Sequence, residues 1–214
     1  MMKYQTYIFD LDGTLLDSLT DLELSCNYAL RVNGMPERTL EEVRMFVGNG
    51  VKKLMERAIP HGLQNPLFDK TYEDFRQHYL VHNLEHTHPY AGIEEMLQHL
   101  IDANKHIAVV SNKFYAATQD LVRHFFGEKI QVAIGERVNI RKKPAPDTVN
   151  EALRLLGVSR ENAVYIGDSD VDIMTAKNSE MPCISVLWGF RDKRFLIEHG
   201  GETFVEKPSE ILDI

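Results

Sequence analysis

Short apolar runs recur along the chain and alternate with longer segments in which apolar residues are spaced three or four positions apart. The runs occupy residues 7–9, 106–111, 163–167 and 183–187, with a shorter one at 132–134. Short continuous apolar runs are typical of strands buried on both faces, whereas the wider spacing is typical of helices. The alternation predicts an α/β fold built on a doubly wound, Rossmann-like parallel sheet.

Two segments beside these strands have the features of helices. Residues 93–103 carry an apolar stripe that we expect to face the sheet, made of Ile93, Met96, Leu97, Leu100 and Ile101. Residues 148–156 are predicted to form a second helix, with Asp147 as its N-cap and Gly157 just past its end.

A long stretch without a strand pattern separates the first apolar run from the second. It is far longer than an ordinary connection between parallel strands, so it predicts an inserted domain. Its apolar residues are spaced as in helices, and Thr39 and Glu42 have the spacing of a capping box. We expect a small helical cap over residues 17–82, inserted into a core formed by residues 1–16 and 83–214.

Composition narrows the class of protein. The 214 residues are 43% hydrophobic and 26% charged, which suits a globular core, and the net charge of −8 argues against a general affinity for nucleic acid or acidic membranes. The two cysteines, Cys26 and Cys183, lack any CxxC spacing, so we expect reduced thiols. The first residues have no apolar signal core, and we expect a cytoplasmic monomer or homodimer.

Carboxylates follow two of the predicted strands. Asp10 and Asp12 come directly after residues 7–9, and Asp168 follows residues 163–167, with Asp172 four positions later. In open α/β sheets ligands collect at the carboxyl ends of strands, and clustered like charges call for a compensating cation. All-oxygen ligands of this kind suit Mg²⁺.

Each carboxylate pair also has an ordinary structural interpretation. Turns rich in Asp and Gly are common, so the Asp10 and Asp12 pair alone favours a turn. Acidic residues near Ser169 and Asp170 could instead complement the dipole of a helix that begins there. Similarly, Ser111, Asn112 or Lys143 taken singly would be a solvated polar residue. The combination of all these groups carries the functional argument.

Four groups, in this order, resemble the motifs of the haloacid dehalogenase superfamily. They are Asp10-Leu11-Asp12-Gly13-Thr14, Ser111-Asn112, Lys143, and Gly167-Asp168-Ser169-Asp170-Val171-Asp172. The insertion just after the first group is similar to the helical-cap branch of that family. Four ordered motifs are far more specific than any one of them.

The resemblance implies a Mg²⁺-dependent phosphomonoester hydrolase. It implies that Asp10 is the nucleophile, forming an aspartyl-phosphate, and that Asp12 is the general acid and base. It further implies that Ser111, Asn112 and Lys143 bind the phosphoryl group. The metal ligands it implies are the side chains of Asp10 and Asp168 and the main-chain carbonyl of Asp12, with Asp172 in support.

A glycine-rich stretch in the predicted cap is a candidate for substrate binding. Gly48, Asn49 and Gly50 interrupt a helical pattern, which lets backbone approach a ligand closely but is equally expected of a simple helix break. The stretch resembles the cap loop of phosphoglycolate phosphatases, and nearby Arg44 and Lys52 could bind a substrate carboxylate. We therefore expect a small acidic phosphoester, 2-phosphoglycolate first among them.

The histidines near residue 85 and the tryptophan each have two interpretations. His82, His86 and His88 could bind a metal, but their spacing fits no zinc pattern and favours a polar linker. Trp188 could border the site or pack beneath the cap.

Other activities and one other class of protein compete with the phosphatase. A β-phosphoglucomutase-like sugar-phosphate mutase or a pyrophosphatase would retain both Asp10 and Asp12. A signalling receiver also uses a phosphorylated aspartate, but receivers are short, lack a cap, and have no acid placed like Asp12. Substrate assays distinguish the first two, and the lifetime of the phosphorylated protein distinguishes the third.

Overall fold

The chain folds into two compact units in the computed structural model, which describes residues 2–214. The core unit comprises the chain up to Leu16 together with Pro89–Ile214, and the helical unit is Asp17–His88. Two short neighbouring strands, β2 (Leu16–Asp17) and β3 (His88–Pro89), mark the passages between the units. The helical unit runs on past the expected boundary at residue 82.

The core unit contains the predicted parallel sheet. Its strands lie in the order β5-β4-β1-β6-β7-β8, and the paired strands run parallel throughout. Their bounds are β1 Thr6–Phe9, β4 His106–Phe114, β5 Val132–Glu136, β6 Ala163–Gly167, β7 Cys183–Val186 and β8 Thr203–Val205. Strand β8 was not predicted, because only three residues form it and two of them are partly exposed.

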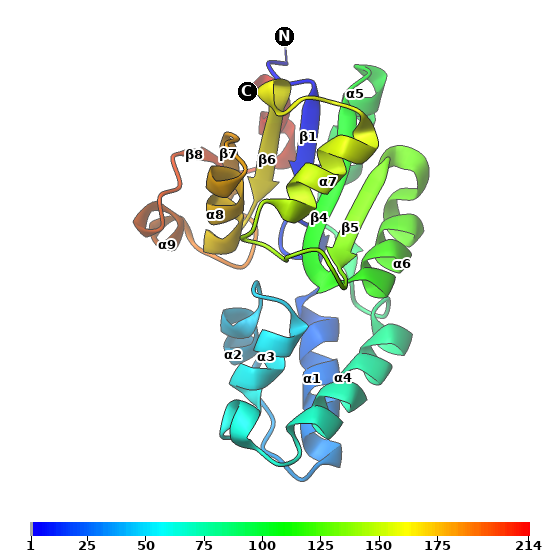
Figure 1. Cartoon of the computed structure of the whole chain (residues 1–214), viewed down its shortest axis with the longest axis vertical. Helices are drawn as coiled ribbons and strands as arrows, with labels where there is room; N and C mark the ends of the chain where they lie inside the picture. The colour runs from blue at the N-terminus through cyan, green and yellow to red at the C-terminus, as the bar shows by residue number, and fades with distance from the viewer. Residues whose placement is uncertain (1) are drawn as a thin grey trace. The chain divides into compact units, whose positions relative to one another are not determined.

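Strand β1 lies in the middle of the sheet, and its side chains alternate between two hydrophobic clusters. Tyr7 and Phe9 belong to the cluster that includes residues of α5 (Ile93–Asp102) and α6 (Tyr115–Phe126). Ile8 belongs to the second cluster, with residues of α7 (Asp147–Leu156) and α8 (Asp170–Asn178). Helices therefore cover both faces of the sheet (Figure 1), as a doubly wound fold requires.

The two predicted ends of the helix α7 have different outcomes. Gly157 adopts the left-handed conformation just after α7, as predicted. Asp147 was predicted wrongly as the N-cap of α7: the helix begins at Asp147 itself, Pro146 precedes it, and Oδ1 of Asp147 accepts a hydrogen bond from Arg141 Nε at 3.0 Å. The remaining elements are α9 (Lys193–Glu198), η2 (Gly127–Lys129), η3 (Arg160–Asn162) and η4 (Pro208–Asp213).

The helical unit consists of α1 (Leu19–Val32), α2 (Leu40–Phe46), α3 (Val51–Ala58), α4 (Phe68–His82) and the short η1 (Gly62–Gln64). The predicted capping box of Thr39 and Glu42 begins α2. Residues 83–88 join this unit because the buried carboxylate of Asp21 on α1 accepts hydrogen bonds from His86 and Thr87 at 2.7 to 3.1 Å. Within residues 2–214, we find no helix with the length and apolar character that a bilayer crossing requires.

Candidate active site

The predicted catalytic groups lie at the carboxyl ends of neighbouring strands. Asp10 follows β1 directly, Asp168 follows β6, and the backbone N–H of Asp10 donates to the carbonyl of Ile166 at 2.8 Å. Between β1 and β6 the order of the strands reverses direction along the chain, and in such sheets ligands bind at this switch point. Strands β1 and β6 lie side by side in the sheet (Figure 1). Their pairing brings together carboxylates that are far apart in sequence.

Lys143 connects the carboxylates. Its ammonium Nζ lies 2.8 Å from Oδ1 of Asp10 and 2.8 Å from Oδ1 of Asp172, and it donates to the hydroxyl of Tyr165 at 3.0 Å. The side chain of Lys143 is 2% exposed, so these partners replace water. The compensating cation that the spacing of the carboxylates indicated is thus supplied in part by the chain itself.

Burial and charge shift the pKa values of these groups. Desolvation, reinforced by the negative charge of Asp172, raises the pKa of Asp10 well above its usual value, although Lys143 opposes the shift. Burial also raises the pKa of Asp168 to about 7, and Asp172 adds to it. For Lys143, burial alone lowers the pKa, but the carboxylates of Asp10 and Asp172 outweigh it and raise the value.

Each oxygen of the Asp172 carboxylate accepts two hydrogen bonds. Its Oδ1 accepts from Lys143 and from the hydroxyl of Tyr165 at 3.1 Å, and its Oδ2 accepts from the backbone N–H and the hydroxyl of Ser169 at 3.2 and 2.6 Å. With Ser169 it forms the capping box of α8. Asp172 therefore caps the first turn of α8 and also holds the lysine.

Asn112 fixes the backbone of the lysine loop. Its amide nitrogen donates to the carbonyl of Lys143 at 3.1 Å, and its amide oxygen accepts from the backbone N–H of Lys143 at 2.9 Å. The geometry therefore gives Asn112 a positioning role in addition to the phosphoryl contact that the motif implies. Ser111, its neighbour on β4, is buried, and its hydroxyl accepts from the backbone N–H of Lys113 at 3.1 Å.

The carboxylate of Asp12 forms an ion pair with a second lysine, Lys113. Nζ of Lys113 lies 3.0 Å from Oδ1 of Asp12, and the side chain of Lys113 is only 1% exposed. The site therefore contains two buried lysines, each directed at one of the two predicted catalytic aspartates.

Asp168 is enclosed by backbone. Its Oδ2 accepts from the backbone N–H of Phe190 at 2.8 Å, and its Oδ1 lies 3.4 Å from the hydroxyl of Thr14. Gly13 has a φ of 82°, and a β-carbon there, or at Gly189, would overlap Asp168. Both positions require glycine so that two loops can approach this carboxylate closely.

Trp188 joins the loop after β7 to the loop after β1. Its indole Nε1 donates to the carbonyl of Thr14 at 2.9 Å, and its ring packs against the core cluster that contains Tyr7 and Phe9. Trp188 therefore lies beside the loop that follows β1.

The carboxylates suit a divalent cation. Asp10, Asp168 and Asp172 each offer an oxygen within 4.8 Å of the others. The negative charge of this buried group exceeds what Lys143 neutralises, and hard oxygen donors are the ligands that Mg²⁺ prefers. Each oxygen of Asp172 already accepts two hydrogen bonds, whereas each oxygen of Asp168 has one donor, so Asp10 and Asp168 are the better ligands of the three.

The predicted substrate loop lies in the helical unit. It connects α2 to α3, and Gly48 and Gly50 have φ values of 116° and 87°. Arg57, which the sequence did not single out, donates to Oδ1 of Asn49 at 2.9 Å and to the carbonyl of Phe46 at 2.8 Å, and so fixes the loop.

The two predicted cations near this loop differ in their surroundings. Arg44 forms a loose ion pair with Glu41 at 3.6 Å, whereas Lys52 is exposed on α3. Their contact with a substrate stays a prediction.

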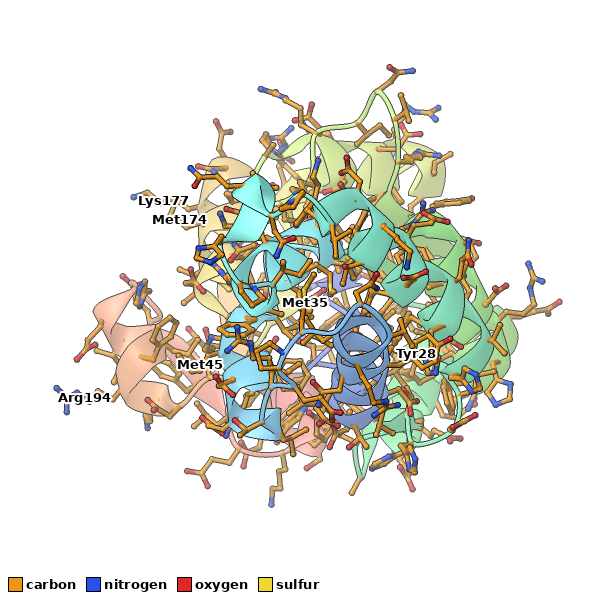
Figure 2. The ribbon with its side chains drawn as sticks, turned by 90° about the horizontal axis from the view of Figure 1, so that it is seen from below. Tyr28, Met35, Met45, Met174, Lys177 and Arg194 are labelled. Atoms are coloured by element: carbon orange, nitrogen blue, oxygen red, sulfur yellow. The ribbon has the colours of Figure 1, made fainter. Side chains whose placement is uncertain are left out.

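The three histidines near the end of the helical unit do not converge on one point. His82 contacts Glu85 at 2.5 Å, the backbone of His86 is bound by Asp21, and His88 contacts the carbonyl of His86. Instead, His82 stacks on His78, which in turn stacks on Tyr28 of α1 at a centroid distance of 4.1 Å. Figure 2 labels the side chain of Tyr28. Among the described residues, the carboxylate cluster is the metal-binding candidate, and these histidines are not.

Comparison with known proteins identifies relatives over most of the chain. Residues 7–186 match the family model described as haloacid dehalogenase-like hydrolase. Phosphoglycolate phosphatase from Rhodobacter capsulatus is 35% identical, and that from Aquifex aeolicus 32% identical; for both, the match covers 86% of this chain and 84% of the relative.

A solved structure is similar throughout its length. It is a crystal structure from Lactobacillus delbrueckii subsp. bulgaricus, of a protein whose role as a phosphoglycolate phosphatase is itself inferred. It is 37% identical, with a TM-score of 0.94, and the match covers 99% of this chain and 98% of that one.

Proposed function

This chain belongs to the haloacid dehalogenase-like hydrolase family, and on that premise we propose that it is a Mg²⁺-dependent phosphatase of small acidic phosphoesters, with 2-phosphoglycolate as the preferred substrate. The observation that carries the proposal is the contact between the buried Lys143 ammonium and the Asp10 carboxylate at the carboxyl end of β1. The names of the relatives support the choice of substrate.

In the proposed mechanism Asp10 attacks phosphorus. One oxygen of its carboxylate forms a bond to phosphorus as the bond to the ester oxygen breaks, which leaves an aspartyl-phosphate. A carboxylate and a phosphate repel each other, so the attack needs positive charge fixed in place beforehand. Lys143 supplies one such charge, and Asn112 and Asp172 hold it at both its backbone and its ammonium.

In the proposed mechanism Asp12 is first the general acid and then the general base. It gives a proton to the departing alkoxide, and as a carboxylate it then takes a proton from the water that attacks the aspartyl-phosphate. After this second step Asp10 is free again and phosphate leaves. Ser111, which lies within β4, is proposed to bind a phosphoryl oxygen.

Asp10, Asp168 and the main-chain carbonyl of Asp12 would hold Mg²⁺. When bound, the ion supplies Lewis-acid stabilisation of the phosphoryl charge. Asp172 supports the site by orienting Lys143. In the helical unit, Gly48, Asn49, Gly50, Arg44 and Lys52 are proposed to contact the organic part of the substrate.

The deciding experiment is a substrate panel. We would measure release of phosphate from 2-phosphoglycolate, p-nitrophenyl phosphate, pyrophosphate, sugar phosphates and nucleotides, each with Mg²⁺ and with EDTA. The matched control is Asp10→Asn, which keeps the shape of the side chain but removes the nucleophile. We expect Mg²⁺-dependent turnover that the variant loses, with the highest kcat/KM for 2-phosphoglycolate.

Other outcomes would redirect the assignment. Highest kcat/KM for pyrophosphate would make the protein a pyrophosphatase. Activity confined to a sugar phosphate in the presence of its bisphosphate would make it a mutase. Turnover that is equal in Asp10→Asn and in the wild-type protein would refute the proposed nucleophile.

A further inference from the structure

Tyr165 places a hydroxyl group in the buried part of the site, although the proposed mechanism does not use it. The residue lies in β6, every residue of which is buried, and it is itself 0% exposed. Its ring belongs to the hydrophobic cluster that contains Ile8, so packing accounts for the ring but not for the hydroxyl. A phenylalanine would fill the same space, and a buried hydroxyl costs free energy unless it is hydrogen-bonded.

This hydroxyl completes the set of acceptors around the Lys143 ammonium. An ammonium group has three N–H donors and accepts no hydrogen bond. Nζ of Lys143 lies 2.8 Å from Oδ1 of Asp10 and 2.8 Å from Oδ1 of Asp172. It donates to the hydroxyl of Tyr165 at 3.0 Å. Three acceptors for three donors fix the orientation of the ammonium as well as its position.

The hydroxyl is itself fixed on its other side. It donates to Oδ1 of Asp172 at 3.1 Å, and Oδ2 of Asp172 is held by the backbone N–H and the hydroxyl of Ser169. Because an ammonium only donates and an ionised carboxylate only accepts, the direction of both hydrogen bonds of Tyr165 is determined. The lone pairs of the hydroxyl are therefore directed at Lys143.

The contact between Lys143 and Asp10 is the one that the proposed reaction changes. When Asp10 forms its bond to phosphorus, its carboxylate becomes an acyl phosphate and loses its own charge. The contacts of Lys143 with Tyr165 and Asp172 involve no reacting atom. They can therefore hold the ammonium in the same place before and after the bond to phosphorus forms.

We propose that Tyr165 is a positioning residue for phosphoryl transfer: its hydroxyl, together with Asp172, directs the third N–H of Lys143 at the reacting group on Asp10. The inference rests on the proposed function and adds to it a residue outside the four motifs. A hydrogen bond weakens steeply when it is misaligned, whereas attraction between charges falls slowly with distance. Loss of the hydroxyl therefore impairs the transition state more than it impairs substrate binding.

The test removes one oxygen atom from each of two buried tyrosines. Tyr165→Phe removes the hydroxyl beside Lys143. Tyr7→Phe is the matched control, because Tyr7 is also 0% exposed and lies in the neighbouring strand β1, but its ring belongs to the other hydrophobic cluster. We would measure kcat and KM for p-nitrophenyl phosphate and 2-phosphoglycolate with Mg²⁺, and the melting temperature of each variant.

We expect Tyr165→Phe to lower kcat by about ten- to hundredfold, with a change in KM of less than about threefold. Tyr7→Phe should leave both values within about twofold of those of the wild-type protein. The same change is then made in Lys143→Met. There Tyr165→Phe should lower kcat by less than about twofold, because the group to be positioned is gone. A purely structural role would lower kcat by the same factor in both backgrounds.

The lysine can also be observed without turnover. We would measure NMR relaxation of the lysine side-chain nitrogens and assign Lys143 by the loss of its signal in Lys143→Met. Three acceptors restrict the motion of the ammonium, so we expect a high order parameter in the wild-type protein and in Tyr7→Phe. In Tyr165→Phe the order parameter should fall.

Three results would overturn the inference. One is a kcat of Tyr165→Phe equal to that of Tyr7→Phe. Another is an equal loss of kcat with and without Lys143. The third is an unchanged order parameter of Lys143 in Tyr165→Phe, which decides the matter if Lys143→Met has no measurable activity. Failure of the proposed function is distinct from these, because the wild-type protein would then release no phosphate from any substrate, while the order parameter would still test the hydroxyl.

Discussion

At the scale of single residues, the site is organised around the ammonium of Lys143. Its contacts with Asp10 and Asp172 hold one positive charge between two carboxylates, and the hydroxyl of Tyr165 accepts a hydrogen bond from the same nitrogen. Burial makes this arrangement matter, because charges in a poorly solvated site interact far more strongly than in water. The remaining negative charge, chiefly that of Asp168, is available to a metal ion.

The first prediction concerns metal binding and pH. Burial raises the pKa of Asp168 to about 7, above the value of about 4 expected in the unfolded chain. In the metal-free protein this group therefore stabilises the fold fully below about pH 4, and the contribution is lost as the pH rises towards about 7. Because a metal ligand must be deprotonated, the affinity for Mg²⁺ rises over the same interval and levels off above it.

The measurement is the rise in melting temperature caused by Mg²⁺ at pH 6 and at pH 8, relative to EDTA. We expect the larger rise at pH 8, with affinity falling roughly tenfold for each pH unit below about 7. Asp168→Asn should lose most of the effect at both pH values. If Mg²⁺ raised the melting temperature of the wild-type protein equally at the two pH values, the assignment of Asp168 as a ligand would be wrong.

At the scale of elements, strands β1, β4 and β6 position the proposed catalytic and metal-binding groups, and much of this was predictable. Short apolar runs followed by Asp10 or Asp168 identify strand ends directly, because side chains that follow a buried strand are fixed by it. Ser111 instead lies within β4, which continues to Phe114. The predicted strands and the helix over residues 93–103 are confirmed. The sheet order follows once the strands are known to be parallel.

What the sequence could not reveal were partners brought together by folding. Tyr165 looks like one more apolar residue of β6, yet its hydroxyl contacts both Lys143 and Asp172. Lys113 looks like a solvated residue after a strand, yet it is buried against Asp12. These roles depend on contacts between strands that are distant in the chain, and residue type and spacing do not encode them.

The second prediction belongs to α1 and the end of the helical unit. Asp21 is 1% exposed, and its carboxylate accepts from the backbone N–H groups of His86 and Thr87 and from the hydroxyl of Thr87. Asp21→Ala leaves these donors buried without an acceptor. We expect it to lower the free energy of unfolding by about 2–4 kcal/mol, measured by urea denaturation.

Asp69→Ala is the matched control, since Asp69 is an exposed aspartate in the same unit. It should change the free energy of unfolding by less than about 1 kcal/mol. In the Asp21 variant the amides of His86 and Thr87 should also exchange with solvent faster. Similar losses of stability in the two variants would show that Asp21 does not hold this segment.

At the scale of the whole molecule, the chain builds one core unit from two segments and inserts a helical unit between them. The clusters on the two faces of the sheet contain residues of the core unit alone. The insertion begins and ends on the neighbouring strands β2 and β3, so its two ends lie close together. Insertions with adjacent ends are tolerated by compact domains.

The third prediction follows from that organisation. A chain in which a short Gly/Ser linker joins Leu16 to Pro89 should still fold, because the sheet, its covering helices and the catalytic groups are all present. We expect a cooperative thermal transition by circular dichroism and a rise in melting temperature with Mg²⁺. The ratio of kcat/KM for 2-phosphoglycolate to that for p-nitrophenyl phosphate should fall, because the helical unit is proposed to contact the organic part of the substrate. A chain without cooperative unfolding would show that the core depends on the insertion.

The glycines beside Asp168 bear on how mutational surveys of this protein are to be understood. A β-carbon at Gly13 or Gly189 would overlap the Asp168 carboxylate, so even replacement by alanine displaces it. In an alanine scan these two positions would score like catalytic residues although neither contributes a functional group. A list of essential positions therefore overstates the number of residues that take part in the chemistry. Loss of activity on substitution of Gly13 or Gly189 would reflect the lack of space beside the Asp168 carboxylate.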